Sequence, residues 1–274
     1  MSTKLYLSGI VCLFVLIPTV QTKCQTTAVG ARSASLAGIS SVEQDVWAAA
    51  NNPAGLGGQS HLSLATSAEQ RFLMKELGYY AFAAAVPSGK GCLGVFAMFS
   101  GYKAYIDQKL SFSYGRRFGE YVFCGTSMVY IFQKAGSENR PIHQVSYELG
   151  TIINLSKKVK LAFAAFNPFQ LYYKSETYAT LPSIFKIGIS AEYSPSLFLF
   201  TECEKDMEFP PIVKVGSEYI FRDIFFIRGG IRIFPVSYSF GAGMRHNGFL
   251  FEFSSSFHQY LGFTPLISLQ YDLK

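Results

Sequence analysis

The residues in this sequence best suited to chemistry are a run of three serines and a nearby histidine, Ser254, Ser255, Ser256 and His258. A serine hydroxyl becomes a nucleophile when a neighbouring histidine accepts its proton, and such a pair in a barrel wall would suit an outer-membrane phospholipase. Ser254, Ser256 and His258 also share one face with Glu252 simply because side chains alternate along a strand. Alternation explains these residues without catalysis, so we expect no catalytic residue and no enzyme.

Metal and cofactor sites have equally little support. The other histidines are His61, His143 and His246, which lie far apart in the chain. After residue 24 three cysteines remain, an odd number with wide spacing that predicts neither a disulfide framework nor a metal site. No stretch has the ligand spacing of a zinc or calcium site. We therefore expect no metal and no cofactor.

The elements that carry the polar residues are short segments in which apolar and polar side chains alternate. In residues 236–245 (VSYSFGAGMR), one face is Val, Tyr, Phe, Ala and Met, and the other is Ser, Gly and Arg. A period of two indicates strands whose two faces meet different surroundings. The pattern recurs throughout residues 186–274. A soluble β-sandwich would alternate in the same way, so alternation alone leaves both classes open.

Composition favours the membrane class. Charged residues make up 15% of the chain and aromatic residues 16%, whereas soluble domains carry about 25% charged residues. Beyond residue 24 there is no apolar run of the ~20 residues that a membrane helix needs. A membrane chain without such helices is expected to be a closed barrel, because lipid offers no partner to a sheet edge. We predict an all-β, transmembrane antiparallel β-barrel. The net charge is +6 with scattered basic residues, so we expect no nucleic-acid partner.

About fourteen strand candidates follow residue 59, close to the ~10-residue length of tilted membrane strands. They are 59–67, 79–86, 91–100, 109–118, 121–133, 143–154, 159–166, 184–193, 197–205, 211–221, 225–233, 236–245, 248–257 and 264–273.

Connection lengths also favour the barrel. The longer predicted connections are 68–78, 101–108, 134–142 and 167–183, and tight turns separate them. Outer-membrane barrels show this alternation, with long loops outside and short turns in the periplasm. The connection at 234–235 is short although its place in the series would suit an outer loop. The pattern also places both termini of the chain on the periplasmic side, as an even number of strands requires.

Charged residues on the polar faces are expected to point into the lumen, because a Lys or Arg facing the middle of the bilayer costs about 2–4 kcal/mol. Both signs occur, which favours mutual neutralisation over an ion-selective pore. The predicted lumenal charges are Lys186, Glu192, Lys214, Glu218, Arg245 and Glu252, and Glu148 and Lys160 follow the same pattern.

Residues 1–24 have the features of a signal peptide: Lys4, an apolar core over 5–20, and small residues before a cleavage point after Cys24. A lipid-anchored Cys24 is the alternative. Residues 25–58 are expected to form a plug-like segment that carries the only tryptophan, Trp47, with a short helix over 45–51 ended by Pro53 and the glycines after it. The barrel then occupies 59–274. Export implies the outer membrane of a Gram-negative bacterium.

An aromatic stretch over 169–182 is the expected recognition loop, since tyrosine is large, rigid and amphipathic. Its candidate partner-binding residues are Tyr172, Tyr173 and Tyr178. The alternative is an aromatic girdle at the lipid interface, which would account for Tyr172 and Tyr173 without any partner.

Two stretches, residues 30–38 (GARSASLAG) and 51–56 (NNPAGL), resemble the PorV/PorQ family of Bacteroidetes outer-membrane proteins, and residues 257–271 resemble that family's end. The family is similar in turn to FadL-type fatty-acid transporters, which share an Asn-Pro-Ala element and a fourteen-stranded barrel. The resemblance implies a component or accessory of type IX protein secretion that binds secretion-system or surface proteins. The alternative is a FadL-like channel for hydrophobic small molecules, with an apolar ligand in the lumen and lateral exit at a strand kink. The plug motif is Asn51, Asn52, Pro53, Ala54, Gly55 and Leu56, either an anchoring turn or a ligand contact.

Overall fold

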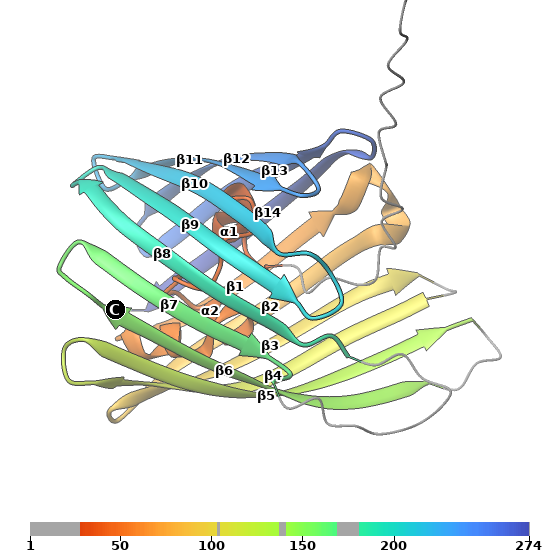
Figure 1. Ribbon diagram of the computed structural model, residues 1–274, viewed down its shortest axis with the longest axis horizontal. Helices are drawn as coiled ribbons and strands as arrows, with labels where there is room; N and C mark the ends of the chain where they lie inside the picture. The colour runs from red at the N-terminus through yellow and green to blue at the C-terminus, as the bar shows by residue number, and fades with distance from the viewer. Residues whose placement is uncertain (1–27, 103–104, 137–140, 169–180, 274) are drawn as a thin grey trace, which may run out of the picture.

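The computed structural model describes residues 28–102, 105–136, 141–168 and 181–273. In these residues fourteen strands form a closed antiparallel barrel, in which each strand pairs with its neighbours in sequence and β1 pairs with β14 (Figure 1). The predicted all-β barrel is therefore confirmed. The strands are β1 Leu62–Gln70, β2 Gly78–Ser88, β3 Gly91–Tyr102, β4 Tyr105–Phe118, β5 Val122–Ala135, β6 Ile142–Asn154, β7 Val159–Phe166, β8 Ile184–Ser194, β9 Leu197–Asp206, β10 Ile212–Phe221, β11 Phe225–Ile233, β12 Ser237–His246, β13 Phe249–His258 and β14 Gly262–Leu273.

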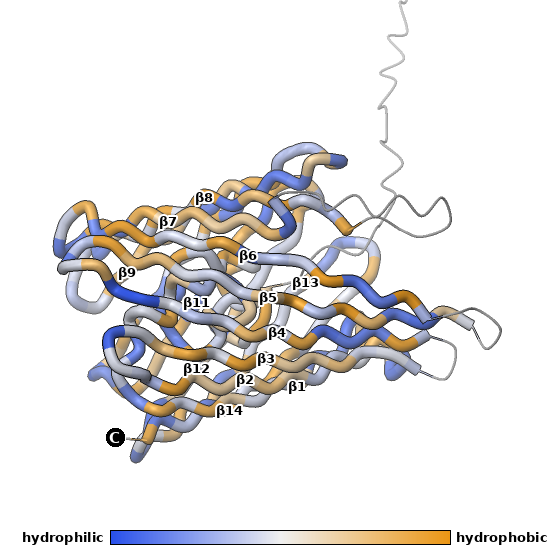
Figure 2. The backbone as a smooth tube through the Cα atoms, turned by 90° about the horizontal axis from the view of Figure 1, so that it is seen from below, coloured by the Kyte–Doolittle hydropathy of each residue, from blue (hydrophilic) through white to orange (hydrophobic). Residues whose placement is uncertain are grey.

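The two faces of the wall differ as the alternation predicts. Large apolar side chains such as Phe82, Phe112 and Ile227 point outward and are exposed. Serines, glycines and charged residues point inward, and many of them are buried. Figure 2 shows hydrophobic and hydrophilic residues alternating along the strands. An apolar outer face is what a bilayer requires of a spanning strand.

Tight turns gather at one end of the barrel, which we call the turn end, and the opposite end is the loop end. The long connection predicted over 101–108 is wrong, because β3 continues to Tyr102 and β4 begins at Tyr105. The strands extend here because Ser100 and Asp107, opposite each other in the ladder, are both buried on the inner face. The first connection contains two 3₁₀ turns, η2 Arg71–Leu73 and η3 Lys75–Leu77.

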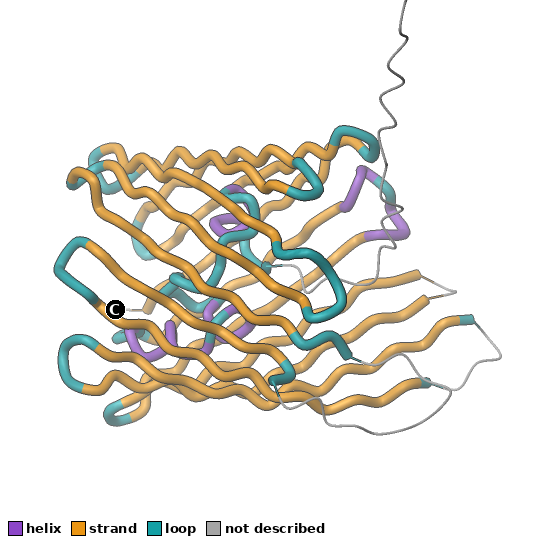
Figure 3. Tube along the Cα trace, in the orientation of Figure 1, coloured by secondary structure: helices purple, strands orange, loops and turns teal. Residues whose placement is uncertain are grey.

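Residues 28–58, which we call the N-terminal segment, lie inside the ring of strands (Figure 3). Its helices are α1 Ala31–Ser35, α2 Ala48–Asn51 and the 3₁₀ helix η1 Pro53–Gly58. The helix predicted over 45–51 is shorter than expected, and α1 forms in a stretch for which no helix was predicted. Among the described residues, no helix has the length and apolarity to cross a membrane.

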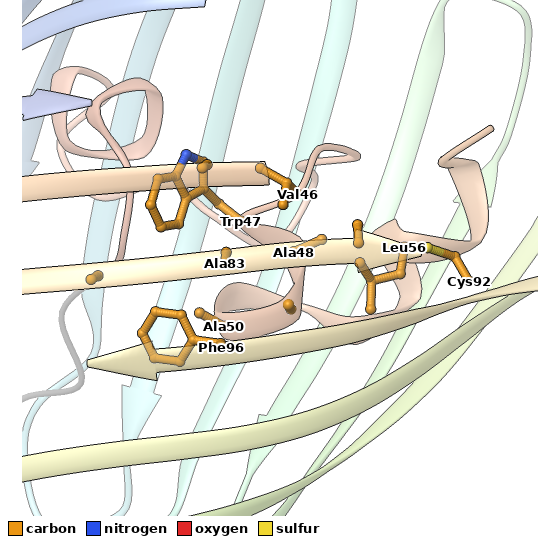
Figure 4. Close-up of a cluster of buried hydrophobic side chains, with 12 residues drawn as sticks. Val46, Trp47, Ala48, Ala50, Leu56, Ala83, Cys92 and Phe96 are labelled. Atoms are coloured by element: carbon orange, nitrogen blue, oxygen red, sulfur yellow. The ribbon is translucent and has the colours of Figure 1, made fainter. Parts of the chain in front are cut away.

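The apolar core lies between this segment and the wall. Trp47, which is 1% exposed, lies near Ala83 of β2 and belongs to one buried cluster with Leu56 of the segment and Phe96 of β3 (Figure 4). Small alanines on α2 let the helix backbone lie close to these strands. Burial of a large aromatic side chain contributes roughly 1.5–3 kcal/mol, so the segment and the barrel stabilise each other.

Candidate functional site

The Asn-Pro-Ala motif anchors the turn between α2 and η1. The Asn52 side chain accepts a hydrogen bond from the Ala54 backbone N–H at 3.1 Å, which caps η1. Its amide nitrogen donates to the Ser41 carbonyl at 2.6 Å. The neighbouring Asn51 exchanges hydrogen bonds with the Val29 backbone at 2.9 and 3.0 Å. Pro53, Ala54, Gly55 and Leu56 are all buried. These contacts tie distant parts of the segment together.

A set of inward glycines brings the segment against the wall. We call them the glycine ring: Gly94, Gly115, Gly125, Gly150, Gly188, Gly216, Gly230 and Gly241. Each lies on a different strand, and a Cβ atom there would meet atoms of the N-terminal segment. At Gly150 the added atom would overlap the Asn52 side chain, and at Gly125 it would overlap Pro53. No such role was predicted for these glycines, although every one of them occupies an inward position of the alternation.

Lys214 is at the centre of the first charged cluster. Its ammonium group lies 2.8 Å from a Glu202 oxygen and 2.7 Å from a Glu204 oxygen, and it is 1% exposed. It also donates to the Gly38 carbonyl of the segment at 2.9 Å. Glu202 accepts backbone N–H bonds from Ser40 and Ser41, which lie on the segment. Lys186, another predicted lumenal charge, donates to the Ser40 hydroxyl at 3.1 Å.

Arg228 is at the centre of the second cluster. It is ion-paired with Glu218 and, at 2.6 Å, with Glu252. Arg32 of α1 binds the two oxygens of Glu218 at 3.1 Å each, so this cluster also joins the segment to the wall. Ser268 donates to the remaining oxygen of Glu252 at 3.1 Å. Charges removed from water are tolerated when they are paired and hydrogen-bonded, and both clusters meet that requirement.

Sequence reasoning placed Lys186, Lys214, Glu218 and Glu252 on the inner face, where the structure also has them. It missed Arg32, Glu202, Glu204 and Arg228, which complete the clusters. The alternation in residues 201–204 (TECE) was a usable signal, because it puts both glutamates on one face. The two remaining predicted charges, Glu192 and Arg245, lie nearer the turn end and line an open basin there.

A small cavity and a surface groove lie on opposite sides of one stretch of wall. The cavity, of about 30 Å³, lies in the lumen on the loop-end side of the segment, beside Asn51 and Pro53. The groove, of about 330 Å³, lies mainly on the outward face of β6 to β9 and is mostly apolar. Both are lined by Leu149, Ala164, Ala165 and Lys186. The inward residues at this part of the wall, Gly150 and Ala164, are small, so little side-chain volume separates the cavity from the groove.

Asp45 of the segment is held near both carboxylates and guanidinium groups. Burial raises the pKa of Asp45 to about 6. The positive charge of Arg32 acts against this rise, and the negative charge of Glu252 adds to it. Arg228 and the backbone N–H of Trp47, which donates to the Asp45 carboxylate at 2.9 Å, also act to lower the pKa. Glu43 is a further neighbouring carboxyl.

The raised pKa of Asp45 predicts a pH-dependent stability. Folding favours the protonated form of the Asp45 carboxyl. The contribution of this group to the stability of the fold is therefore complete below the usual pKa of 3.8, and it is lost as pH rises through about 6. We expect Asp45→Asn to raise the thermal midpoint at pH 8 and to change it little at pH 4. Asp223→Asn, in an exposed turn, is the control. If the thermal midpoints of wild type and Asp45→Asn changed in parallel between pH 4 and pH 8, the raised pKa of Asp45 would be contradicted.

The serine–histidine pair considered from the sequence does not form. The ring of His258 lies 6.3 Å from the Phe72 ring and 6.0 Å from the Tyr260 ring, and its Nδ1 atom accepts a hydrogen bond from the Tyr260 backbone N–H at 3.3 Å. Within the described ranges, no serine hydrogen-bonds to His258, and no three His, Cys, Asp or Glu side chains gather where they could hold a metal ion. The tyrosines proposed for a partner loop, Tyr172, Tyr173 and Tyr178, fall outside the described residues.

Comparison with known proteins shows likeness in fold alone. No protein-family model matches the sequence, and no curated protein matches it by sequence. Among solved structures, the chain is similar to the CymD monoaromatic hydrocarbon channel, with 13% identity, a TM-score of 0.70 and coverage of 90% of this chain and 98% of that one. It is similar to the Ralstonia pickettii toluene transporter TbuX, with 11% identity, a TM-score of 0.72 and coverage of 91% and 99%. A Pseudomonas aeruginosa FadL homologue gives 12% identity, a TM-score of 0.64 and coverage of 89% and 98%.

Proposed function

We propose that this protein is an outer-membrane channel for apolar small molecules, in which the N-terminal segment closes the lumen and solutes pass between lumen and lipid through the wall at β6 to β8. The observation that carries the proposal is the shared lining of the lumenal cavity and the lipid-facing groove. The similar folds of a monoaromatic hydrocarbon channel and a toluene transporter support the same solute class.

The structure is in a closed form, because a cavity of about 30 Å³ holds little more than one water molecule. Passage therefore requires the wall to open beside the cavity. Gly150 and Ala164 have small side chains and β7 has 8 residues, so opening here breaks a short stretch of ladder and few side-chain contacts. The segment itself is held by ion pairs and close backbone contacts, so the proposed route runs beside it rather than through it.

Filling the groove tests this route. We expect Ala165→Trp, whose ring would occupy the groove, to reduce uptake of radiolabelled naphthalene by about tenfold, equivalent to ~1.4 kcal/mol of added barrier. Uptake is measured in a Gram-negative host with an intact outer membrane. The control is Ala242→Trp on the outward face of β12, which adds the same ring elsewhere. Equal uptake by Ala165→Trp and wild type, or no uptake above the empty host for wild type, would rule out the proposal.

The type IX secretion role stays a prediction from the resemblance to the PorV/PorQ family. Its expected contact residues, Tyr172, Tyr173 and Tyr178, lie outside the described part of the chain. Replacing the three with serine and testing for loss of a co-purifying surface protein from native membranes would decide whether the loop binds a partner.

A further inference from the structure

An open basin of about 430 Å³ occupies the turn end of the barrel on the side of β7 to β14. It exists because the N-terminal segment fills the lumen unevenly. Helix η1 packs against β3 to β6 at this end, which leaves the opposite half of the mouth unfilled. The floor includes Arg32, Gln44 and Asp45 of the segment. The volume lies within the ~300–1,000 Å³ range of small-molecule sites.

Part of the basin wall is apolar and aromatic. Phe200, Phe226 and Leu250 lie on the inner face and are almost fully buried. The small part of each side chain that stays accessible faces the basin and not lipid. The guanidinium of Arg245 lies 5.3 Å from the centre of the Phe226 ring, and that of Arg32 lies 5.4 Å from the Phe200 ring. The apolar lining residues are Val42, Phe198, Phe200, Ile220, Phe226 and Leu250. Such walls would hold a hydrocarbon or aromatic ring out of water.

The charges around the basin are unbalanced. Six cationic side chains and three carboxylates line it, an excess of three positive charges. Glu218 is already shared by Arg32 and Arg228. The other four cations are Lys157, Lys158, Lys160 and Arg245, and within the described residues none of them forms an ion pair. Lys160 instead donates to the neutral side-chain carbonyl of Gln44.

The distribution of these cations indicates where a ligand's charge would sit. Lys157 and Lys158 lie in the exposed turn between β6 and β7, whereas Lys160 and Arg245 project from the walls. A concave site lined by one sign of charge and low-dielectric walls concentrates oppositely charged solutes. The site therefore combines an apolar wall with an uncompensated cationic rim.

We propose that the turn-end basin binds a small amphiphilic anion, a molecule with one carboxylate or sulfonate on an apolar or aromatic body. The body packs against Phe198, Phe200 and Phe226, and the anionic group faces the unpaired cations that line the basin, of which Lys160 and Arg245 project from the strands. This binding is an equilibrium property of the closed barrel and does not depend on transport through the wall at β6 to β8.

The first experiment needs only the wild-type protein. The full chain in lipid nanodiscs is titrated calorimetrically with 1-naphthoate and separately with 1-naphthalenemethanol, which has the same ring without the charge. We expect saturable binding of one naphthoate, about tenfold tighter than binding of the alcohol. Equal heats and affinities for the two compounds, or no saturable binding of naphthoate, would overturn the proposal.

A matched pair of double variants locates the site. Lys160→Gln with Arg245→Gln removes one lysine and one arginine from the basin and should weaken naphthoate binding by about tenfold. Lys90→Gln with Arg117→Gln removes the same charges from exposed positions at the same end of β2 and β4 and should leave the affinity unchanged. If both double variants weakened naphthoate binding equally, the overall charge of the protein and not the basin would explain the effect, and the proposed site would be overturned. Since Ala165→Trp leaves the basin intact, loss of naphthalene uptake with retained naphthoate binding separates this proposal from the transport proposal.

Discussion

Replacing Lys214 with methionine is expected to lower the free energy of unfolding by about 3–5 kcal/mol, the cost of leaving buried charges without their partner. Lys214 neutralises both Glu202 and Glu204 at 2.7–2.8 Å, and it holds the Gly38 carbonyl of the N-terminal segment. Lys186, at 4.0 Å from Glu204, cannot replace both contacts. Unfolding by guanidinium in lipid vesicles, followed by the fluorescence of the single tryptophan, Trp47, measures the loss.

The destabilisation should be specific to the buried charges. Adding Glu204→Gln to Lys214→Met removes one uncompensated carboxylate and should recover part of the lost stability. Lys90→Met, in an exposed turn, should change the free energy of unfolding by less than about 0.5 kcal/mol. If Lys214→Met were no worse than Lys90→Met, the cluster would not be stabilising the fold.

The second large effect is expected at the glycine ring. A Cβ at Gly230 would lie 2.6 Å from the Leu36 carbonyl carbon and 2.7 Å from the Ala37 nitrogen, both backbone atoms of the N-terminal segment. Since backbone atoms cannot move aside as a flexible side chain can, Gly230→Ala should cost about 1–3 kcal/mol through overpacking. It should also make Trp47 more accessible to acrylamide, because the segment is pushed from the wall.

The adjacent glycine supplies the control. Gly229 lies on the opposite face of β11, and the nearest atom to its added Cβ is the Ser239 oxygen at 3.9 Å, an ordinary contact. Gly229→Ala should therefore keep the stability or raise it slightly, because alanine restricts the unfolded chain. Equal thermal midpoints and equal acrylamide quenching for the two variants would refute close packing of the segment at Gly230.

Together the glycine ring and the charged clusters make the N-terminal segment an inner layer of the barrel. Removing it would leave Glu218 without Arg32, strip Glu202 of two N–H donors and uncover Ala83 and Phe96 on the inner face of the wall. For the proposed channel, this arrangement favours opening of the wall. It argues against release of the N-terminal segment from the lumen. It also leaves the half-filled turn-end mouth in which the basin lies.

The sequence by itself determined the architecture, because side-chain alternation is a local property that fixes which face of a strand meets lipid. It determined that Lys186, Lys214, Glu218 and Glu252 belong inside, because a charge facing lipid is costly. It failed over 101–108, where β3 continues to Tyr102 and β4 begins at Tyr105. Only the pairing of the two strands shows that this stretch is not a long loop, because Ser100 and Asp107 face each other in the ladder and are buried on the inner face.

Only the tertiary structure decided how the interior is filled. Arg32 and Glu218 are 186 positions apart, and they meet because the closed barrel folds around the segment. The glycine ring is likewise invisible in any one strand, since an inward glycine becomes a contact only when the segment reaches it. Pairing and packing across a lumen depend on the register of all fourteen strands at once, whereas the alternation that defines each strand depends on a few neighbouring residues.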